Sequence, residues 1–170
     1  SNATYIGAGK ALGNILISFN RNSAGKYYNS IFTNQQYGVL IEKTENSGDS
    51  FDQLQNENLV FANNIFYNIA GNDLDSMLMI YNRKDPGSQR VSLFLKEYFL
   101  KNENIIHDPG IKLSNGQYHV LPDTIAYQNL YDMTDEWYYS VNYKGAFGSV
   151  NWTRDWTLLD KHGIIQPDFW

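Results

Sequence analysis

The stretch NSIFTN at residues 29–34 returns as NIFYN at residues 64–68. Each copy holds an Ile-Phe pair and ends on asparagine, a residue that tolerates left-handed dihedrals and can bond its own backbone at a sharp turn. If the two copies stack on one another, their apolar side chains form one inward ladder and their asparagine amides form another. The repeated stretch therefore predicts strands piled in parallel, as in a β-solenoid.

Other parts of the chain share this strand-like character. Period-two alternation and the content of β-branched and aromatic residues predict five strands, at residues 12–19, 26–32, 37–43, 58–68 and 76–81. Twenty asparagines among 170 residues punctuate these runs. Residues 45–55 are polar and predict a loop between successive coils, and residues 82–87 predict a turn.

One helix and a terminal cap complete the expected architecture. Apolar residues recur from Val91 to Phe99 at the spacing of one helix face. Aromatic residues concentrate at positions 137–170, and we expect their rings to pack together as a compact cap that Trp152 and Trp156 pin in place. We therefore expect one domain over residues 4–170, with coils at 4–82, the helix and its connection at 83–104 and the cap at 105–170. Residues 1–3, SNA, are interpreted as a tag scar.

Composition excludes several classes of protein. A hydrophobic fraction of 42%, with 13 Tyr, 9 Phe and 4 Trp, is typical of a folded chain rather than a disordered one. The net charge of −5 and the lack of a basic run argue against nucleic-acid binding. No cysteine is present, which excludes disulfides, thiol catalysis and thiolate-zinc sites. The apolar runs are much shorter than the roughly 20 residues that a membrane helix needs, so no transmembrane segment is expected.

The C-terminal sequence resembles a known family. VNYKGAFG at residues 141–148, followed by NWTRDWTLLD at residues 151–160, is similar to the closing segment of a large family of secreted β-helix proteins. That family is common in Bacteroidetes-type bacteria, as surface lipoproteins or secreted proteins that mostly lack an assigned activity. NLVFANNIFYN at residues 58–68 looks like its coils, and DPG at residues 108–110 looks like its linker after the helix. One departure is Asn142, where the family more often has aspartate.

The resemblance implies a fold and a location but no substrate. The implied fold class is mainly β, a right-handed parallel β-helix fragment of the pectin-lyase type with one helix and an aromatic-rich C-terminal cap. We expect the protein to be secreted or on the outer cell surface, with its signal or lipid anchor removed, and this chain to be a fragment of a longer one.

Catalytic and metal-binding chemistry finds little support in the sequence. Polysaccharide lyases and glycoside hydrolases of the β-helix type need carboxylates that converge on one face. Asp73 and Asp75 could share a face, and Asp132, Asp135 and Glu136 form a small acidic group, but solvated turns explain both better. The three histidines lack ligand spacing. We therefore assign no catalytic residue, metal ligand or cofactor, and keep the lyase or hydrolase as an alternative.

Binding without chemistry is the favoured hypothesis. Exposed Tyr and Trp rings stack on sugar rings while nearby amides and carboxylates bond the hydroxyls. An aromatic in a strand is more often a core residue. We nevertheless expect a site for a polysaccharide or a host or cell-surface glycan, and hence a role in glycan binding or adhesion, among Tyr27, Tyr28, Tyr37, Tyr138, Tyr139 and Trp170. A purely structural C-terminal portion of a larger surface protein is the third possibility. Buried rings would favour that structural role, and a groove with exposed rings would favour binding.

Overall fold

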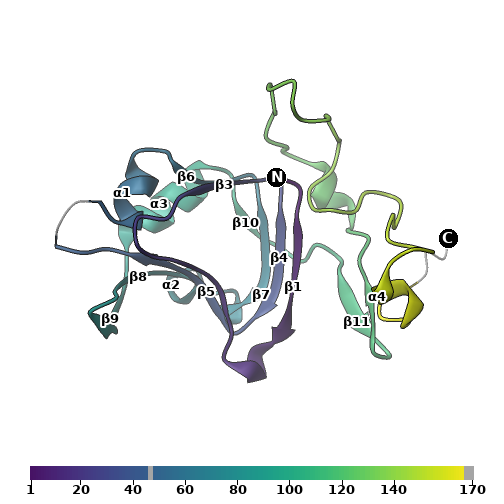
Figure 1. Ribbon diagram of the computed structural model, residues 1–170, viewed down its shortest axis with the longest axis horizontal. Coiled ribbons are helices and arrows are strands. Elements are labelled where there is room, and N and C mark those ends of the chain that lie inside the picture. Colours follow the sequence, from purple (N-terminus) through teal and green to yellow (C-terminus); the bar gives the residue numbers. More distant parts are fainter. Residues whose placement is uncertain (46–47, 167–170) are drawn as a thin grey trace.

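The computed structural model describes residues 1–45 and 48–166, and its strands form four separate short sheets (Figure 1). The first sheet has the order β1-β4-β7-β10, and all its pairs are parallel. Its strands are β1 (Thr4–Gly9), β4 (Ile31–Gln35), β7 (Ile65–Ile69) and β10 (Ile105–Ile106).

The second sheet has the order β2-β5-β8-β9 and ends in an antiparallel pair. Its strands are β2 (Ile15–Phe19), β5 (Tyr37–Glu42), β8 (Leu78–Asn82) and β9 (Asp85–Val91). The third sheet is the parallel pair of β3 (Gly25–Tyr28) and β6 (Leu59–Ala62). The fourth is the antiparallel hairpin of β11 (Lys112–Ser114) and β12 (Gln117–His119).

Short helices fill the connections between these strands. The α-helices are α1 (Ser50–Gln55), α2 (Leu74–Met77), α3 (Leu93–Lys101) and α4 (Leu158–Lys161). Three 3₁₀ turns are η1 (Lys10–Leu12), η2 (Ala70–Asn72) and η3 (Thr124–Tyr127). The carboxylates of Asp49 and Asp73 cap α1 and α2 by accepting a backbone N–H three residues on, which satisfies a donor that the first helical turn leaves unpaired.

The repeated Ile-Phe stretch pairs with itself. Ile31 lies opposite Ile65 and Phe32 opposite Phe66 in the parallel pair of β4 and β7. The two phenylalanine rings stack with their centroids 4.8 Å apart. The asparagines at the end of each copy, Asn34 and Asn68, have φ of 67° and 53° and are joined by a side-chain hydrogen bond of 2.9 Å. Their predicted role as left-handed turn residues is confirmed.

A second set of amides forms a buried ladder at the other end of these strands. Asn64 is fully buried, and its Oδ1 accepts the backbone N–H of Ser30 at 2.8 Å. Its Nδ2 donates to the carbonyl of Tyr27 at 2.8 Å and to Oδ1 of Asn104 at 2.9 Å. Asn104 in turn donates to the carbonyl of Phe61 at 2.9 Å. These bonds satisfy backbone groups where the chain passes from one sheet to the next, a place where no sheet ladder can do so.

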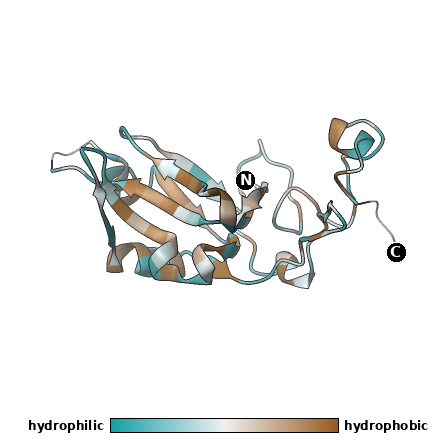
Figure 2. Cartoon of the chain, turned by 90° about the horizontal axis from the view of Figure 1, so that it is seen from below, coloured by the Kyte–Doolittle hydropathy of each residue, from teal (hydrophilic) through white to brown (hydrophobic). Residues whose placement is uncertain are grey.

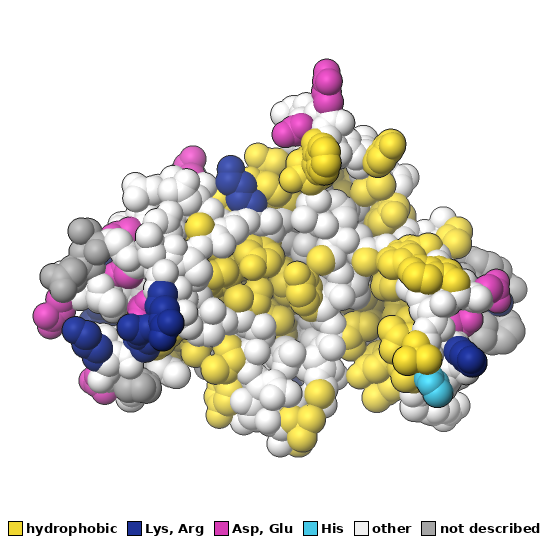
Figure 3. Space-filling view, viewed as in Figure 1, with side chains coloured by type: hydrophobic (Ala, Val, Ile, Leu, Met, Phe, Trp, Pro, Cys, Tyr) yellow, Lys and Arg dark blue, Asp and Glu magenta, His cyan; other side chains and the backbone are white. Residues whose placement is uncertain are grey.

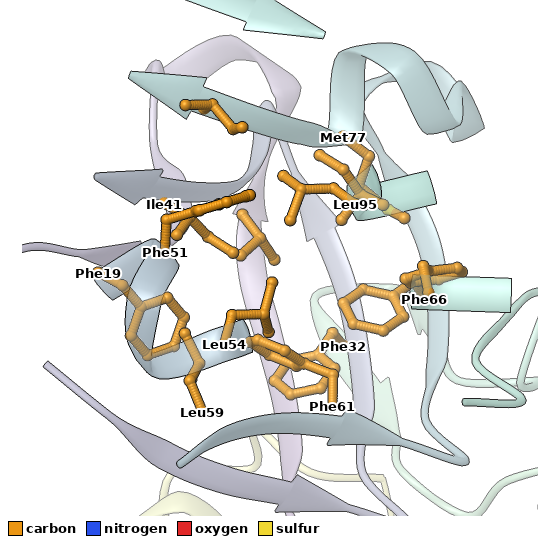
Figure 4. Packing of buried hydrophobic residues seen from close by; sticks show 14 of the residues in the cluster. Phe19, Phe32, Ile41, Phe51, Leu54, Leu59, Phe61, Phe66, Met77 and Leu95 are labelled. Carbon is orange, nitrogen blue, oxygen red and sulfur yellow. The ribbon is translucent and has the colours of Figure 1, made fainter. Parts of the chain in front are cut away.

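The main hydrophobic core lies between the first three sheets and is closed by α3 (Figure 4). Phe32, Phe66, Leu54 and Met77 are each at most 1% exposed. Phe99 of α3 contacts Phe66 with ring centroids 5.1 Å apart. Burying one such side chain contributes about 1.5–3 kcal/mol. Figure 2 shows hydrophobic residues concentrated on the strands, with several hydrophilic connecting loops.

The prediction of a right-handed parallel β-helix fragment is wrong. The structure is a mixed α/β arrangement of four short sheets, with antiparallel pairs at β8–β9 and β11–β12. The chain turns back after β8, so residues 85–91 form a strand where the sequence predicted a turn followed by a helix. Residues 50–55, expected to be a loop, are helical because Asp49 caps them. Strand-like periodicity predicts extended segments but does not decide how they pair.

The predicted boundaries of the elements also differ from the observed ones. The expected strand at 58–68 is two strands, because Asn63 adopts φ of 55° between β6 and β7. The expected strand at 26–32 likewise breaks at Asn29, where φ is 48°. The expected helix is present as α3 but begins after Ser92, whose hydroxyl caps it, and Val91 closes β9 instead.

The prediction of an aromatic cap with buried rings is wrong too. Residues 112–166 lie beside the outer face of the first sheet, where Val120, Leu121, Phe147 and Ile165 form a small core with Ile6 (Figure 1). The indole of Trp137 is 84% exposed and that of Trp156 is 69% exposed. The short turns of this segment leave no second layer to cover such rings. Within residues 1–45 and 48–166, no helix combines the length and apolar character needed to cross a membrane.

Candidate functional site

A hollow of about 640 Å³ lies along the β3–β6 pair, beside α3 and the end of α1. Lys26 and Tyr28 of β3 stand opposite Val60 and Ala62 of β6, and all four side chains line it. Alternation along β3 places Tyr27 on the opposite side, in the core. The residues that supply polar or aromatic groups from other elements are Gln55, Glu57, Phe94, Glu97, Tyr98, Lys101, Asn102 and Tyr131.

Corner asparagines hold the wall of this hollow in place. The amide of Asn29 makes two bonds to the backbone of Tyr131: Nδ2 donates to the carbonyl at 3.0 Å, and Oδ1 accepts the N–H at 2.7 Å. Asn63 donates from Nδ2 to the carbonyl of Asn129 at 2.9 Å and to the carboxylate of Glu103 at 2.8 Å. The residues that turn the chain between strands therefore also fix the loop at 129–131.

The loop places one tyrosine ring on another. Tyr28 and Tyr131 stack with centroids 4.2 Å apart and planes 12° apart. Burial, and then the neighbouring Tyr131, raise the pKa of Tyr28 to about 12. Burial also raises the pKa of Tyr98, whose hydroxyl lies 3.5 Å from the carbonyl of Leu59. Both phenols are therefore neutral at physiological pH and can donate or accept hydrogen bonds.

A second hollow of about 560 Å³ adjoins the first, and Tyr131 lines both. Its walls are the turn residues Asn2 and Asn29 and two parts of the projecting loop, residues 130–133 and 139–143. Asn2 donates from Nδ2 to the carbonyl of Tyr143 at 2.7 Å, which ties the N-terminal segment to this wall. We call the two hollows together, joined at Tyr131, the Tyr131 cleft.

The Tyr131 cleft presents rings, amides and balanced charges. Lys26, Lys101, Glu57 and Glu97 line the first hollow, and among the described residues Asp132 is the one charged side chain that lines the second. Asn102 and Gln55 add amides to the first hollow, and Asn2 and Asn142 add amides to the second. Such a surface suits a ligand with apolar faces and many hydroxyls better than a polyanion, which needs an excess of cations.

The structure brings two of the six predicted binding residues into the cleft. Tyr28 lines the first hollow, and Tyr139 lines the second with 97% of its side chain exposed. Tyr138 is 44% exposed beside Tyr139, and its backbone N–H bonds the carbonyl of Asp135. The loop that carries both projects from the molecule, with hydrophobic and acidic side chains at its surface (Figure 3).

Two of the other predicted residues, Tyr27 and Tyr37, lie elsewhere. Tyr27 stacks on Phe61 inside the core with centroids 4.9 Å apart. Tyr37 is 47% exposed and lines a separate hollow of about 540 Å³ with Ile15, Leu40 and Met79, on the outer side of the second sheet. Trp170 falls outside the described residues.

Sequence reasoning missed Tyr131, Tyr98 and Lys26. Tyr131 stands 103 positions after Tyr28, and only the asparagine contacts to its backbone bring the two together. Tyr98 belongs to the apolar face of the predicted helix, a position that predicts packing against the core. The asparagines in left-handed turns were the one local signal in the sequence. Their side-chain amides can bond the backbone of a later segment that packs on the turn.

In the part of the chain that the structure describes, no three His, Asp or Glu side chains gather as a possible metal site. Comparisons of the chain with protein-family models, with curated proteins and with solved structures give no match.

Proposed function

We propose that the protein binds a neutral oligosaccharide or polysaccharide in the Tyr131 cleft and that its role is recognition rather than catalysis. The observation that carries this proposal is the juxtaposition of two hollows that share one tyrosine and are lined by Tyr28, Tyr98, Tyr131 and Tyr139. Rings supply apolar faces for sugar stacking, and the amides between them supply donors and acceptors for hydroxyl groups.

The shape of the cleft supports an extended ligand rather than a single sugar. The hollows measure about 640 and 560 Å³ and share Tyr131 as a lining residue. A drug-sized ligand fills a site of roughly 300–1,000 Å³. A chain of several sugars could therefore occupy both hollows and pass over Tyr131, whose ring is 40% exposed.

The location of the protein is a part of the same proposal. A secreted or cell-surface position rests on the resemblance of residues 141–148 and 151–160 to the closing segment of secreted proteins. A surface position would place the cleft where polysaccharides are abundant. An adhesion role would follow from the same binding.

A glycan array tests the proposal. The purified chain is expected to give saturable binding to one class of neutral glycan, and Tyr28→Ala is expected to weaken it at least fivefold. Tyr37→Ala is the control, because Tyr37 is an exposed tyrosine that lines a different hollow. Absence of binding to every glycan, or equal weakening by both variants, would refute the assignment to this cleft.

Ionic strength provides a second check. Because two lysines and two glutamates line the first hollow, its formal charge is balanced and binding should change less than twofold between low and high salt. A steep loss of affinity with salt would indicate an anionic ligand instead.

A further inference from the structure

The loop that projects from the molecule carries the two most exposed aromatic rings of the described residues. We call residues 132–141 the Trp137 loop. Trp137 is 84% exposed and Tyr139 is 97% exposed (Figure 3). In the part of the chain that the structure describes, no ring stacks on the indole of Trp137 and no hydrogen bond engages its indole N–H. Tryptophan and tyrosine are the residue types that most often dominate the binding energy of protein interfaces, so the loop has the composition of a contact surface.

Backbone and side-chain hydrogen bonds fix the shape of the Trp137 loop. Oδ1 of Asp135 accepts the backbone N–H of Trp137 at 2.9 Å, and the carbonyl of Asp135 accepts the backbone N–H of Tyr138 at 3.0 Å. These two bonds form a turn that presents the indole at its surface. The flanking residues Tyr131 and Tyr143 are tied to the body of the protein by the asparagine amides described above. Because the turn is ordered in advance, a partner that binds it loses less conformational entropy.

The charge of the Trp137 loop is negative and unpaired. Residues 113–143 contain four acidic residues and no lysine or arginine. Three of the four, Asp132, Asp135 and Glu136, belong to the loop. Among residues 1–45 and 48–166, none of these three carboxylates forms a salt bridge. The lysines of the Tyr131 cleft do not offset them, because those lysines line the first hollow together with two glutamates. Exposed rings and uncompensated carboxylates therefore occur together.

We infer that the Trp137 loop binds an arginine-bearing segment of another protein. A guanidinium stacks on the face of Trp or Tyr by a cation–π interaction, and it pairs with a carboxylate through two parallel hydrogen bonds. The loop supplies both kinds of group at adjacent positions, Glu136 and Trp137. A neutral sugar would leave the three carboxylates unused. Nucleic acid and an anionic membrane would be repelled by them.

Three peptides test the requirement for arginine. The probe is a short peptide of alternating arginine and glycine that carries an uncharged fluorescent label, and fluorescence anisotropy should show saturable binding. A peptide with lysine in place of arginine should bind at least threefold more weakly, because an ammonium lacks the planar fork that stacks and pairs at the same time. A peptide with citrulline, which keeps the planar shape but not the charge, should bind at least tenfold more weakly. Raising the salt concentration from about 50 to 300 mM should weaken the arginine peptide at least fivefold, since the carboxylates are exposed to solvent.

Protein variants locate the peptide on the loop. Trp137→Ala should weaken binding at least fivefold. Trp156→Ala is the matched control, because Trp156 is also well exposed, at 69%, but residues 154–161 contain two acidic and two basic side chains. That variant should leave binding unchanged. The double variant Asp132→Asn, Glu136→Gln should weaken binding at least threefold and should remain folded, since in the described part of the chain neither carboxylate bonds another residue.

Three results would overturn the inference. The first is equal binding of the arginine and citrulline peptides, or binding of neither. The second is equal affinity of the Trp137→Ala and Trp156→Ala variants for the arginine peptide. The third is a concentration-dependent dimer in sedimentation that Trp137→Ala dissolves, which would make a second copy the occupant. The inference does not rest on the proposed glycan binding, and a failed glycan array bears on the Tyr131 cleft alone.

Discussion

Replacing Asn64 by alanine should be among the most damaging single substitutions in this protein. The side chain is fully buried and makes three hydrogen bonds, to the N–H of Ser30, the carbonyl of Tyr27 and Oδ1 of Asn104, at 2.8 to 2.9 Å. Alanine removes all three side-chain bonds and leaves the N–H of Ser30 without its acceptor, while Oδ1 of Asn104 keeps the bond that it accepts from the backbone N–H of residue 64 at 3.2 Å. At about 1–2 kcal/mol for each of the two groups that lose their side-chain partner, the free energy of unfolding should fall by about 2–4 kcal/mol.

Urea unfolding followed by circular dichroism measures this loss. Asn58→Ala is the matched control, because Asn58 is exposed and its amide bonds only the side chain of Gln53, at 2.8 Å. That variant should change the free energy of unfolding by less than about 0.5 kcal/mol. If Asn64→Ala costs no more than Asn58→Ala, the buried amide ladder does not stabilise the junction between the sheets, and the reasoning fails.

Two further predictions concern buried positions. Lys144 is 1% exposed, and desolvation lowers its pKa to about 8 against the opposing effect of Glu103. Because the unfolded chain holds that proton up to its ordinary pKa of 10.5, the free energy of unfolding should rise by about 2 kcal/mol from pH 8 to pH 10. It should fall again above the ordinary tyrosine pKa of 10.0, because burial raises the pKa of Tyr28. The free energy of unfolding of Lys144→Met should lack this rise between pH 8 and pH 10. If the rise persists in that variant, groups other than Lys144 cause it. Gly38→Ala should cost about 3 kcal/mol in urea unfolding, since its Cβ would lie 2.1 Å from the carbonyl oxygen of Met77. Gly87→Ala, with 3.6 Å of clearance, should be nearly neutral, and equal losses would contradict the steric argument.

Local features of this fold could be predicted from the sequence because they depend on neighbouring residues. The left-handed turns at Asn34 and Asn68 follow from the short amide side chain, and the helix stripe up to Phe99 follows from its spacing. The pairing of strands could not be predicted in the same way. Whether β9 turns back against β8 depends on contacts across the sheet, and its polar sequence gives no periodic signal.

In the candidate site, too, the local features could be predicted from the sequence and the long-range contacts could not. The sequence predicted that Tyr138 and Tyr139 bind a ligand, and Tyr139 lines the cleft. The pairing of Tyr28 with Tyr131 arises from the docking of residues 129–131 on Asn29 and Asn63, a long-range contact without a local signature. Trp152 and Trp156 were expected to pin the cap, and their rings do stack, with centroids 5.8 Å apart, while Trp152 also stacks on Phe147 at 5.7 Å. Both rings nevertheless stay largely at the surface, where their indole N–H groups bond the carbonyls of Ala146 and Trp152.

A titration with oligosaccharides of increasing length tests the central claim, that the two hollows form one site through Tyr131. The ligand series is the glycan class identified on the array, from the disaccharide to the hexasaccharide, and calorimetry gives each affinity. Affinity should rise with length in the unmodified chain, and Tyr131→Ala should abolish this rise, because the shared wall and its ring are lost. Affinities that rise equally in both proteins, or that do not depend on length in either, would contradict it.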